Sequence, residues 1–404
     1  MGLYSYRLSA KVGQVTGAPV ALQVACVALF ATGMLTSCGT SRRKSERSVS
    51  PCDVSQAARQ LDLVVGRMIS EGRLVRGDGF VYAIDVALLA LSAAIGNNRL
   101  RYEQLVAMAK NDFVVENPTK PTAPFVTWRR QLAPARSVPD ASGTTEAFQM
   151  AQALLVGGGV FRRSTDTLLA ARLLDGYALH ADTVDGTWLV RNYYNLGTNA
   201  FATNSYLIDY APDLLMYAAT ELRRSHLEEV ATKSTALIRG AVRPNGLIDA
   251  VIQPELKTLF TFVVFSPNDV IKLEHSAMVA EQVVGSAREV SEGVLLFALS
   301  RLDDLHAAYE GRTGAPHGSD RANAGTFAAV ARLAVRLKQP AAIEKLCPPL
   351  VTHSLTLART YPEVEAHVAA QALLGLQFLL RWQARQDLPA SLKAHPDLPL
   401  KWLL

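Results

Sequence analysis

The segment that begins at Val86 reads Val-Ala-Leu-Leu-Ala-Leu-Ser-Ala-Ala-Ile and contains no charged side chain. Two later stretches are of the same kind: Met-Ala-Gln-Ala-Leu-Leu-Val from Met150, and Ala-Ala-Gln-Ala-Leu-Leu-Gly-Leu from Ala369. A helix that is apolar on most of its sides is buried. Segments 99–113 and 223–240 instead carry charged faces, which are typical of helices exposed to solvent. The contrast predicts an inner and an outer layer of helices.

Apolar residues recur at helical spacing along most of the chain, and this periodicity predicts twelve helices. The expected ranges are 54–73, 80–95, 99–113, 143–157, 163–181, 205–221, 223–240, 267–284, 288–310, 320–338, 340–358 and 361–385. Strand patterns are scarce, and the best is Leu259 to Phe265, as an arm of a short hairpin. Six buried helices that alternate with six exposed ones predict an all-α (α/α)6 toroid, with the even-numbered helices inside. An α-solenoid is the rival architecture, but no motif repeats at a fixed period.

The predicted connections before the fourth, sixth and eighth helices are long, at about 114–142, 182–204 and 241–266. Connections of this length are uncommon unless they are functional. In an (α/α)6 toroid the N-terminal ends of the inner helices share one face with these loops. We therefore expect a cleft at that face.

Polar and aromatic side chains gather at the starts of the even-numbered helices. The opening segments are Gly77-Asp78-Gly79-Phe80-Val81-Tyr82, Asp140-Ala141-Ser142-Gly143-Thr144-Thr145-Glu146, Thr203-Asn204-Ser205-Tyr206 and Ser266-Pro267-Asn268-Asp269. Aromatic rings stack on the C–H faces of sugars, while carboxylates bind hydroxyl groups or transfer protons. The combination predicts a carbohydrate site.

The predicted site has two kinds of residue. Its catalytic carboxylates are Asp78, Glu146 and Asp269. Its substrate-binding residues are Tyr82, Trp128, Trp188, Tyr193, Tyr194, Asn204 and Tyr206. The alternative is that the polar residues only cap helices, because Asp, Ser, Thr and Asn are preferred at N-caps and acids are favoured in first turns.

The order of these motifs resembles glycoside hydrolase family 8, which comprises inverting β-glucanases and chitosanases with an (α/α)6 barrel. The family's Ser-Glu-Gly-x-Gly-Tyr segment is similar to residues 77–82, which puts Asp78 in the place of the general acid. Its Ala-Thr-Asp-Ala-Asp segment is similar to residues 143–147, and its Asn-Pro-Ser-Tyr to residues 203–206. Its Asp-Ala-x-Arg, which holds the general base, is similar to residues 269–272. The chain departs from the family in Asp78 for Glu, in both lost aspartates of the second motif, and in Lys272 for Arg. Asp-Ala-Ser-Gly-Thr also resembles unsaturated-glycuronyl hydrolases on a similar barrel.

The resemblance implies an inverting glycoside hydrolase that acts on a β-linked glucan or an amino-sugar polymer. In it Asp78 would protonate the leaving oxygen, Asp269 would activate water, and Glu146 would hold a sugar hydroxyl or tune Asp78. Two alternatives remain. One is a polysaccharide-binding lipoprotein that has lost the acid. The other is a uronate lyase or epimerase that uses Tyr193, Tyr194, Arg191 and His275.

The N-terminal segment predicts export. Arg7 and Lys11 precede an uncharged apolar stretch from about Ala18, which ends Leu35-Thr36-Ser37-Cys38 in the pattern of a lipobox. We expect a lipoprotein signal peptide at 1–37, lipid on Cys38, a flexible tether at 38–53, the barrel at 54–390 and a tail at 391–404. A transmembrane anchor and a buried helix are the alternatives.

Composition narrows the partners. The net charge is +5, but several of the basic residues lie in the tether, so no nucleic-acid footprint is visible. No metal-ligand pattern or cofactor motif occurs, and the sequence predicts neither. Of four cysteines, Cys52 and Cys347 remain in the mature chain and could form one disulfide in an oxidising compartment. The predicted partners are a polysaccharide and, through the lipid, the membrane of the bacterial envelope.

Overall fold

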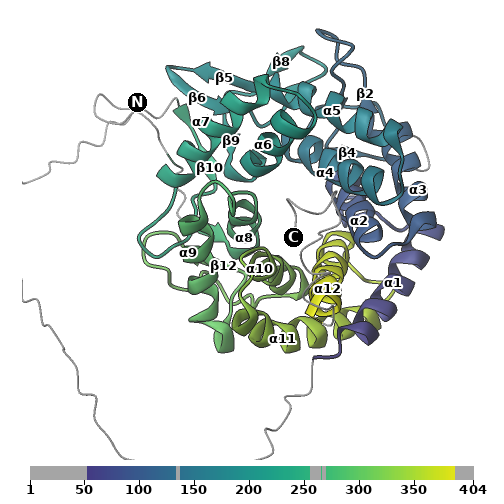
Figure 1. Ribbon diagram of the computed structural model, residues 1–404, viewed down its shortest axis with the longest axis vertical. Helices are drawn as coiled ribbons and strands as arrows, with labels where there is room; N and C mark the ends of the chain where they lie inside the picture. Colours follow the sequence, from purple (N-terminus) through teal and green to yellow (C-terminus); the bar gives the residue numbers. More distant parts are fainter. Residues whose placement is uncertain (1–51, 133–136, 255–264, 266–269, 387–404) are drawn as a thin grey trace, which may run out of the picture. The chain divides into compact units, whose positions relative to one another are not determined.

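The computed structural model describes residues 52–132, 137–254, 265 and 270–386. These residues fold into two concentric rings of helices (Figure 1). The inner ring consists of α2 (Ala83–Ile95), α4 (Thr144–Val160), α6 (Pro212–Glu221), α8 (Leu273–Glu281), α10 (Ala324–Arg336) and α12 (Ala366–Gln386). The outer ring consists of α1 (Val54–Ser70), α3 (Arg99–Met108), α5 (Ser164–Ala178), α7 (His226–Gly240), α9 (Arg288–Leu299) and α11 (Pro340–Arg359). The predicted (α/α)6 toroid, with even-numbered helices inside, is confirmed.

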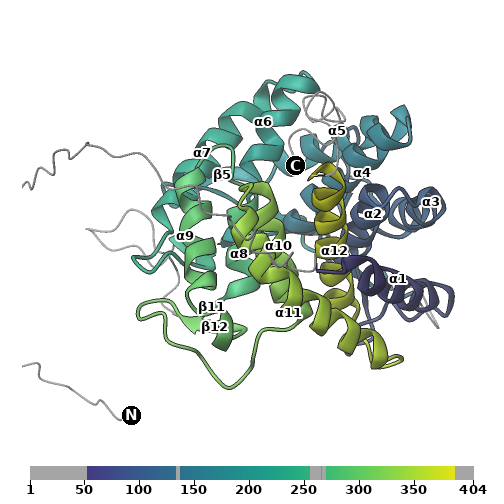
Figure 2. The same cartoon turned by 60° about the horizontal axis from the view of Figure 1, so that its bottom comes forward.

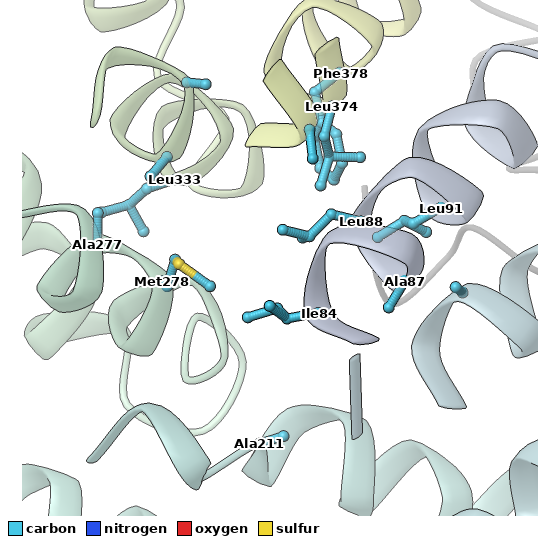
Figure 3. Packing of buried hydrophobic residues seen from close by; sticks show 14 of the residues in the cluster. Ile84, Ala87, Leu88, Leu91, Ala211, Ala277, Met278, Leu333, Leu374 and Phe378 are labelled. Carbon is cyan, nitrogen blue, oxygen red and sulfur yellow. The ribbon is translucent and has the colours of Figure 1, made fainter. Parts of the chain in front are cut away.

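The difference between inner and outer helices follows from their sequences. Every residue of α2 is buried, as expected for a helix with apolar side chains on all faces. Helix α7 buries only a stripe at helical spacing, from Leu227 to Ile238, and turns its charged face outward. Figure 3 shows how the inner side chains meet, with Leu88 of α2, Met278 of α8 and Leu374 of α12 directed toward one another.

The ring closes where the last helices meet the first. Helix α12 packs against α2 and α1, and α11 packs against α1 (Figures 1 and 2). A disulfide between Cys52 and Cys347, whose Cα atoms are 6.0 Å apart, joins the residue just before α1 to α11. The disulfide that the sequence allowed between Cys52 and Cys347 is therefore present and spans this closure.

Short antiparallel strand pairs lead into three of the inner helices. They are β1 (Val81–Tyr82) with β4 (Arg129–Arg130), β9 (Ser205–Tyr206) with β10 (Val251–Ile252), and β11 (Val270–Lys272) with β12 (Ala308–Glu310). The others are β2 (Val114–Val115) with β3 (Phe125–Val126), β5 (Ala181–Val184) with β6 (Thr187–Val190), and β7 (Tyr194–Asn195) with β8 (Ala200–Phe201). Because pairing holds the residues before each helix extended, α2 and α8 begin later than the predicted positions 80 and 267.

Other boundaries were also wrong for identifiable reasons. The helix predicted at 205–221 begins at Pro212, because a residue before proline disfavours the helical region and Ala211 lies outside it. The helix predicted at 288–310 ends at Leu299 and is followed by a 3-10 turn and β12. Of the strand predicted at 259–265, only Phe265 is described, and it bridges to Ile252.

Several predictions fall on residues outside the described ranges: the signal peptide, Cys38, the tether up to residue 51, Asp269 and the tail at 391–404. Within the described ranges no helix is long and apolar enough to cross a membrane.

Candidate active site

Acidic residues occupy the first turns of the inner helices. Asp85 is the third residue of α2, Glu146 the third of α4, and Glu274 the second of α8. Asp209 ends the 3-10 turn η2 (Leu207–Asp209) that precedes α6. His367 is the second residue of α12. The contacts below bring these side chains to one end of the toroid.

An ion-pair chain of Arg76, Asp85, His367 and Glu274 links three inner helices. Arg76 donates from Nε and Nη2 to the two oxygens of Asp85, at 2.9 and 2.6 Å. His367 lies between two carboxylates, with Nδ1 2.8 Å from Asp85 Oδ1 and Nε2 2.8 Å from Glu274 Oε1. The side chain of Asp85 is 0% exposed and that of Glu274 is 13% exposed. Both ring nitrogens therefore face carboxylates, the arrangement of an imidazolium.

The ion-pair chain sets the charges of its members. Burial disfavours the charged form of His367, but its hydrogen bonds to both carboxylates outweigh burial and raise its pKa to about 9. Burial likewise opposes ionisation of Glu274, yet His367 lowers the pKa of that carboxyl to about 2. The pKa of Asp85 is also lowered, because His367 and Arg76 overcome its burial. At neutral pH the ion-pair chain therefore consists of two cations, Arg76 and His367, and two anions, Asp85 and Glu274.

Glu146 and Asp209 have the opposite character. The pKa of Glu146 is raised to about 7, and burial is the main cause. The charge of Asp85 also raises this pKa, whereas the charges of Arg76 and His367 lower it. These charges place Glu146 beside the ion-pair chain. Burial raises the pKa of Asp209 to about 8, although it accepts hydrogen bonds from the Thr145 hydroxyl at 2.5 Å and the Tyr206 amide at 3.1 Å. The site therefore contains carboxyls that are protonated near neutral pH next to carboxylates that are not.

Gly143 lets Glu146 approach the rim. A Cβ atom at Gly143 would overlap the Glu146 carboxylate and would lie 2.9 Å from Trp128 Cβ. Only glycine fits between these two side chains. Glu146, which is partly exposed, thus lies against the segment that carries Trp128.

Asp78 lies at the rim and is 39% exposed. It accepts a hydrogen bond from the Tyr82 hydroxyl at 2.6 Å and another from Arg129 at 3.2 Å. The Tyr82 hydrogen bond is the main reason why the pKa of Asp78 is lowered, and Arg129 adds to it. A general acid at this position would have to hold a proton, but the Asp78 side chain is exposed and stabilised as an anion.

Aromatic side chains surround Asp78. The Tyr82 and Trp128 rings meet edge to face with centroids 5.6 Å apart. The Arg129 guanidinium stacks 4.1 Å from the Trp128 ring centroid, and Trp128 Nε1 donates to Asp140 at 2.8 Å. We call Asp78, Tyr82, Trp128 and Arg129 the aromatic rim. It combines ring faces with charged hydrogen-bonding groups, as a sugar-binding surface requires.

The remaining predicted residues do not all join this rim. Tyr206 is 38% exposed and lines a small cavity with Lys272 and His275. Tyr194 is buried, with its ring 4.8 Å from that of Phe201, so it belongs to the core. Trp188 lies against the outer helices α5 and α7. The backbone of Tyr194 is hydrogen-bonded to Ser142, just before α4, but its ring is buried, and Trp188 faces the outer helices.

Tyr193 and Asn204 belong to the connection before α6. Tyr193 is exposed and its carbonyl accepts from the Ala202 amide, while the Asn204 carbonyl accepts from the Asn192 amide. Arg191, expected in the uronate alternative, stacks on Phe201 and pairs with Asp182 at 3.2 Å. Burial lowers the pKa of His275 to about 4. Tyr194 and Arg191 both contact Phe201, whereas His275 lines the cavity with Tyr206.

Sequence reasoning missed Arg76, Asp85, Asp209, Glu274 and His367. A signal existed for two of them, since Tyr82-Ala83-Ile84-Asp85 and Tyr206-Leu207-Ile208-Asp209 share one spacing of tyrosine, isoleucine and aspartate. No local pattern marks His367, which contacts residues more than 90 positions away. Among the described residues, no group of three or more His, Cys, Asp or Glu is placed to hold a metal ion.

A ring of six helix pairs, with the even-numbered helices inside, defines an (α/α)6 toroid. No family profile matches the sequence, and no curated protein sequence matches it either. Several solved structures of other proteins share the fold of this chain. Endo-β-1,4-glucanase CMCax from Acetobacter xylinum matches with a TM-score of 0.60 at 14% identity, over 81% of this chain and 98% of that one.

Two further structures show the same fold. Endoglucanase Cel10 from Klebsiella pneumoniae, a family 8 glycosyl hydrolase, matches with a TM-score of 0.55 at 12% identity, over 80% of this chain and all of that one. A β-1,3-1,4-glucanase from Paenibacillus sp. X4 has a TM-score of 0.58 at 12% identity and covers 80% and 93% of the two chains. At these identities the comparison concerns the fold, and the fold resembles that of glycoside hydrolase family 8.

Proposed function

We propose that this chain is an inverting glycoside hydrolase acting on a β-linked glucan or an amino-sugar polymer. The observation that carries the proposal is the placement of Glu146, whose carboxyl lies at the start of the inner helix α4 and close to Trp128. Burial raises the pKa of this carboxyl to about 7. A general acid must hold its proton at the working pH and then release it to the leaving oxygen. Glu146 has that property, and it lies against the aromatic rim where a sugar would stack.

The proposed role of Glu146 differs from the one that the family resemblance implies. Asp78 occupies the family's acid position, but hydrogen bonds from Tyr82 and Arg129 stabilise it as an anion. We therefore assign it to the binding of sugar hydroxyls. Asp269 stays the proposed general base, since it precedes α8 by a few residues. The ion-pair chain joins the starts of α2, α8 and α12. Inversion would require the carboxyls of Glu146 and Asp269 to stand about 6.5–9.5 Å apart.

The test is release of reducing ends from mixed-linkage β-glucan, carboxymethylcellulose and chitosan. Wild-type protein should cleave at least one polymer, and Glu146→Gln should lower kcat by about 10²- to 10⁴-fold without loss of binding. Because Glu146 must be protonated, wild-type activity should fall as pH rises above about 7. Proton NMR of the first product should show the inverted anomer.

Asp78→Asn is the matched control. It removes an exposed rim carboxylate, and we expect a change in KM with kcat lowered less than about tenfold. Loss of turnover in Asp78→Asn with an active Glu146→Gln would return the acid to the family position. Wild-type protein that binds these polymers but releases no reducing ends would replace the hydrolase with a polysaccharide-binding protein.

We also propose that the protein is exported and anchored through lipid on Cys38. The Cys52–Cys347 disulfide supports this location, because disulfides persist in oxidising compartments. Cells that express the chain should incorporate labelled fatty acid into it, and Cys38→Ala should abolish that label and leave an unprocessed precursor. Equal labelling of both proteins would contradict the anchor.

A further inference from the structure

A cavity of about 300 Å³ lies on the outer side of the toroid, away from the inner-helix starts. It is bounded by α5, α7 and the β5–β6 hairpin, the last two of which are adjacent in Figure 1. Its polar wall consists of Lys120, Asp175, His226 and Glu229, and its aromatic wall is Trp188. Alanine, leucine and valine side chains from the same elements form the rest.

The β5–β6 hairpin fixes the direction of Trp188. Its neighbours Thr187 and Leu189 are buried, whereas Trp188 is only partly buried. Since successive residues of a strand point to opposite faces, Trp188 points outward to the cavity. Lys233 of α7 lies 5.6 Å from the centre of its ring. The indole is thus held in place and presented at the surface of the cavity.

Asp175 supplies an acceptor that basic side chains approach without donating a hydrogen bond to Oδ1. Its side chain is 16% exposed, and its Oδ1 atom is buried and accepts no hydrogen bond from any described residue. His226 Nε2 lies 3.2 Å from Oδ1, and Arg224 Nη2 lies 3.6 Å from Oδ2. A buried acceptor without a hydrogen bond is costly and unusual in a folded protein. A ligand hydroxyl in the cavity would satisfy it.

We propose that this cavity is a second carbohydrate site, which binds one pyranose unit of a polysaccharide outside the toroid. The apolar wall and Trp188 match the C–H face of a pyranose ring. For the hydroxyls of the sugar, the carboxylates of Asp175 and Glu229 provide acceptors and the ammonium group of Lys120 provides donors. The volume is at the lower end for ligand pockets, which suits a single sugar unit.

The inference rests on the proposed function, since it assumes a polysaccharide ligand. A second site on the same chain raises the effective concentration of a long polymer at the first site, but does nothing for a fragment too short to reach both. The second site should therefore affect polymers more than oligosaccharides.

The experiment follows the indole N–H signals of the full-length chain, which has four tryptophans, by NMR. Trp188→Phe and Trp128→Phe assign the two signals of interest. Titration with cellotetraose and with chitotetraose should shift the Trp188 signal in wild-type protein and equally in Glu146→Gln. A Trp188 signal that stays in place at saturating concentrations of both sugars would overturn the second site.

A binding measurement completes the test. In affinity electrophoresis with mixed-linkage β-glucan and chitosan, Trp188→Ala should weaken retention about tenfold, while tetrasaccharide cleavage stays unchanged. Leu168→Ala, an exposed residue of α5, is the control and should bind like wild type. Equal retention of Trp188→Ala and wild type would also overturn the site. A shifting Trp188 signal in a protein that cleaves nothing would leave this site standing and reject the hydrolase.

Discussion

Two sectors of the inner ring carry buried aspartates near the starts of their helices and give them different protonation states. In the sector of α2, α8 and α12, Asp85 is fully buried and its pKa is lowered. In the sector of α4 and α6, Asp209 is also fully buried, at the same distance from its tyrosine, yet its pKa is raised to about 8. Burial and sequence spacing are alike, so neither explains the difference.

The difference lies in the partners. Asp85 accepts from the guanidinium of Arg76 and from the His367 ring, and such charge-assisted hydrogen bonds stabilise an anion strongly. Asp209 accepts from the Thr145 hydroxyl and from the backbone amides of Tyr206 and Thr145, which do not offset its burial, and the charge of Glu146 raises its pKa further toward the protonated form. A first-turn position therefore places a carboxyl at the mouth of the toroid, and the cations of neighbouring elements decide whether it keeps a proton.

The largest expected effect comes from removing the cation that joins the α2, α8 and α12 sector. His367→Ala leaves Asp85 with Arg76 alone and Glu274 without its main partner. Breaking a buried ion pair typically costs about 3–5 kcal/mol, and we expect a loss of that size in the free energy of unfolding by urea at pH 7. His367→Lys, which keeps a cation, should recover part of it. Stability equal to wild type in His367→Ala would mean that the ion-pair chain contributes nothing.

A smaller effect separates the two buried aspartates directly. Asp85→Asn removes an ionised group from between two cations, and we expect a loss of about 3 kcal/mol at pH 6. Asp209→Asn replaces a group that is already neutral at that pH with a similar amide, and should cost less than about 1 kcal/mol. Urea unfolding of both variants measures the contrast. Equal losses would show that the two sectors do not differ in charge.

The smallest effect is a change of slope with pH. Because the pKa of Asp209 is raised from 3.8 to about 8 on folding, its contribution is fully present below about pH 4 and is lost as pH rises to 8. One proton corresponds to about 1.4 kcal/mol per pH unit. Between pH 5 and 8 the free energy of unfolding should fall less steeply with pH for Asp209→Asn than for wild type. The difference in slope should be up to about 1.4 kcal/mol per pH unit. Parallel curves would mean that Asp209 is ionised throughout.

Much of the fold could be predicted from the sequence, because packing follows composition. The uncharged run from Val86 predicts a helix buried on every side, and α2 has that burial. The boundaries were less accurate where tertiary pairing overrides local preference. Helical periodicity predicted a helix from residue 205, but residues 205 and 206 form strand β9, which pairs with β10. Helix α6 begins only at Pro212.

The site divided in the same way. Tyr82, Trp128 and Glu146 could be named because each lies next to an inner helix in the chain, and those ends share one face of a toroid. Tyr194 and Trp188 have the same sequence context, but β7 turns the first into the core and β6 turns the second toward the outer helices. The residues next to Tyr194 and Trp188 in the sequence do not indicate in which direction each side chain points.

By itself, the sequence determined the alternation of buried and exposed helices, and with it the toroid; of the buried acids near the inner-helix starts, it indicated Glu146 but not Asp85, Asp209 or Glu274. Helical periodicity and burial are properties of neighbouring residues, so they can be read along the chain. Only the tertiary structure decided which acids are protonated. The pKa of a buried carboxyl depends on charges a few ångströms away, and for Asp85 and Glu274 the decisive one is His367, which follows them by 282 and 93 residues.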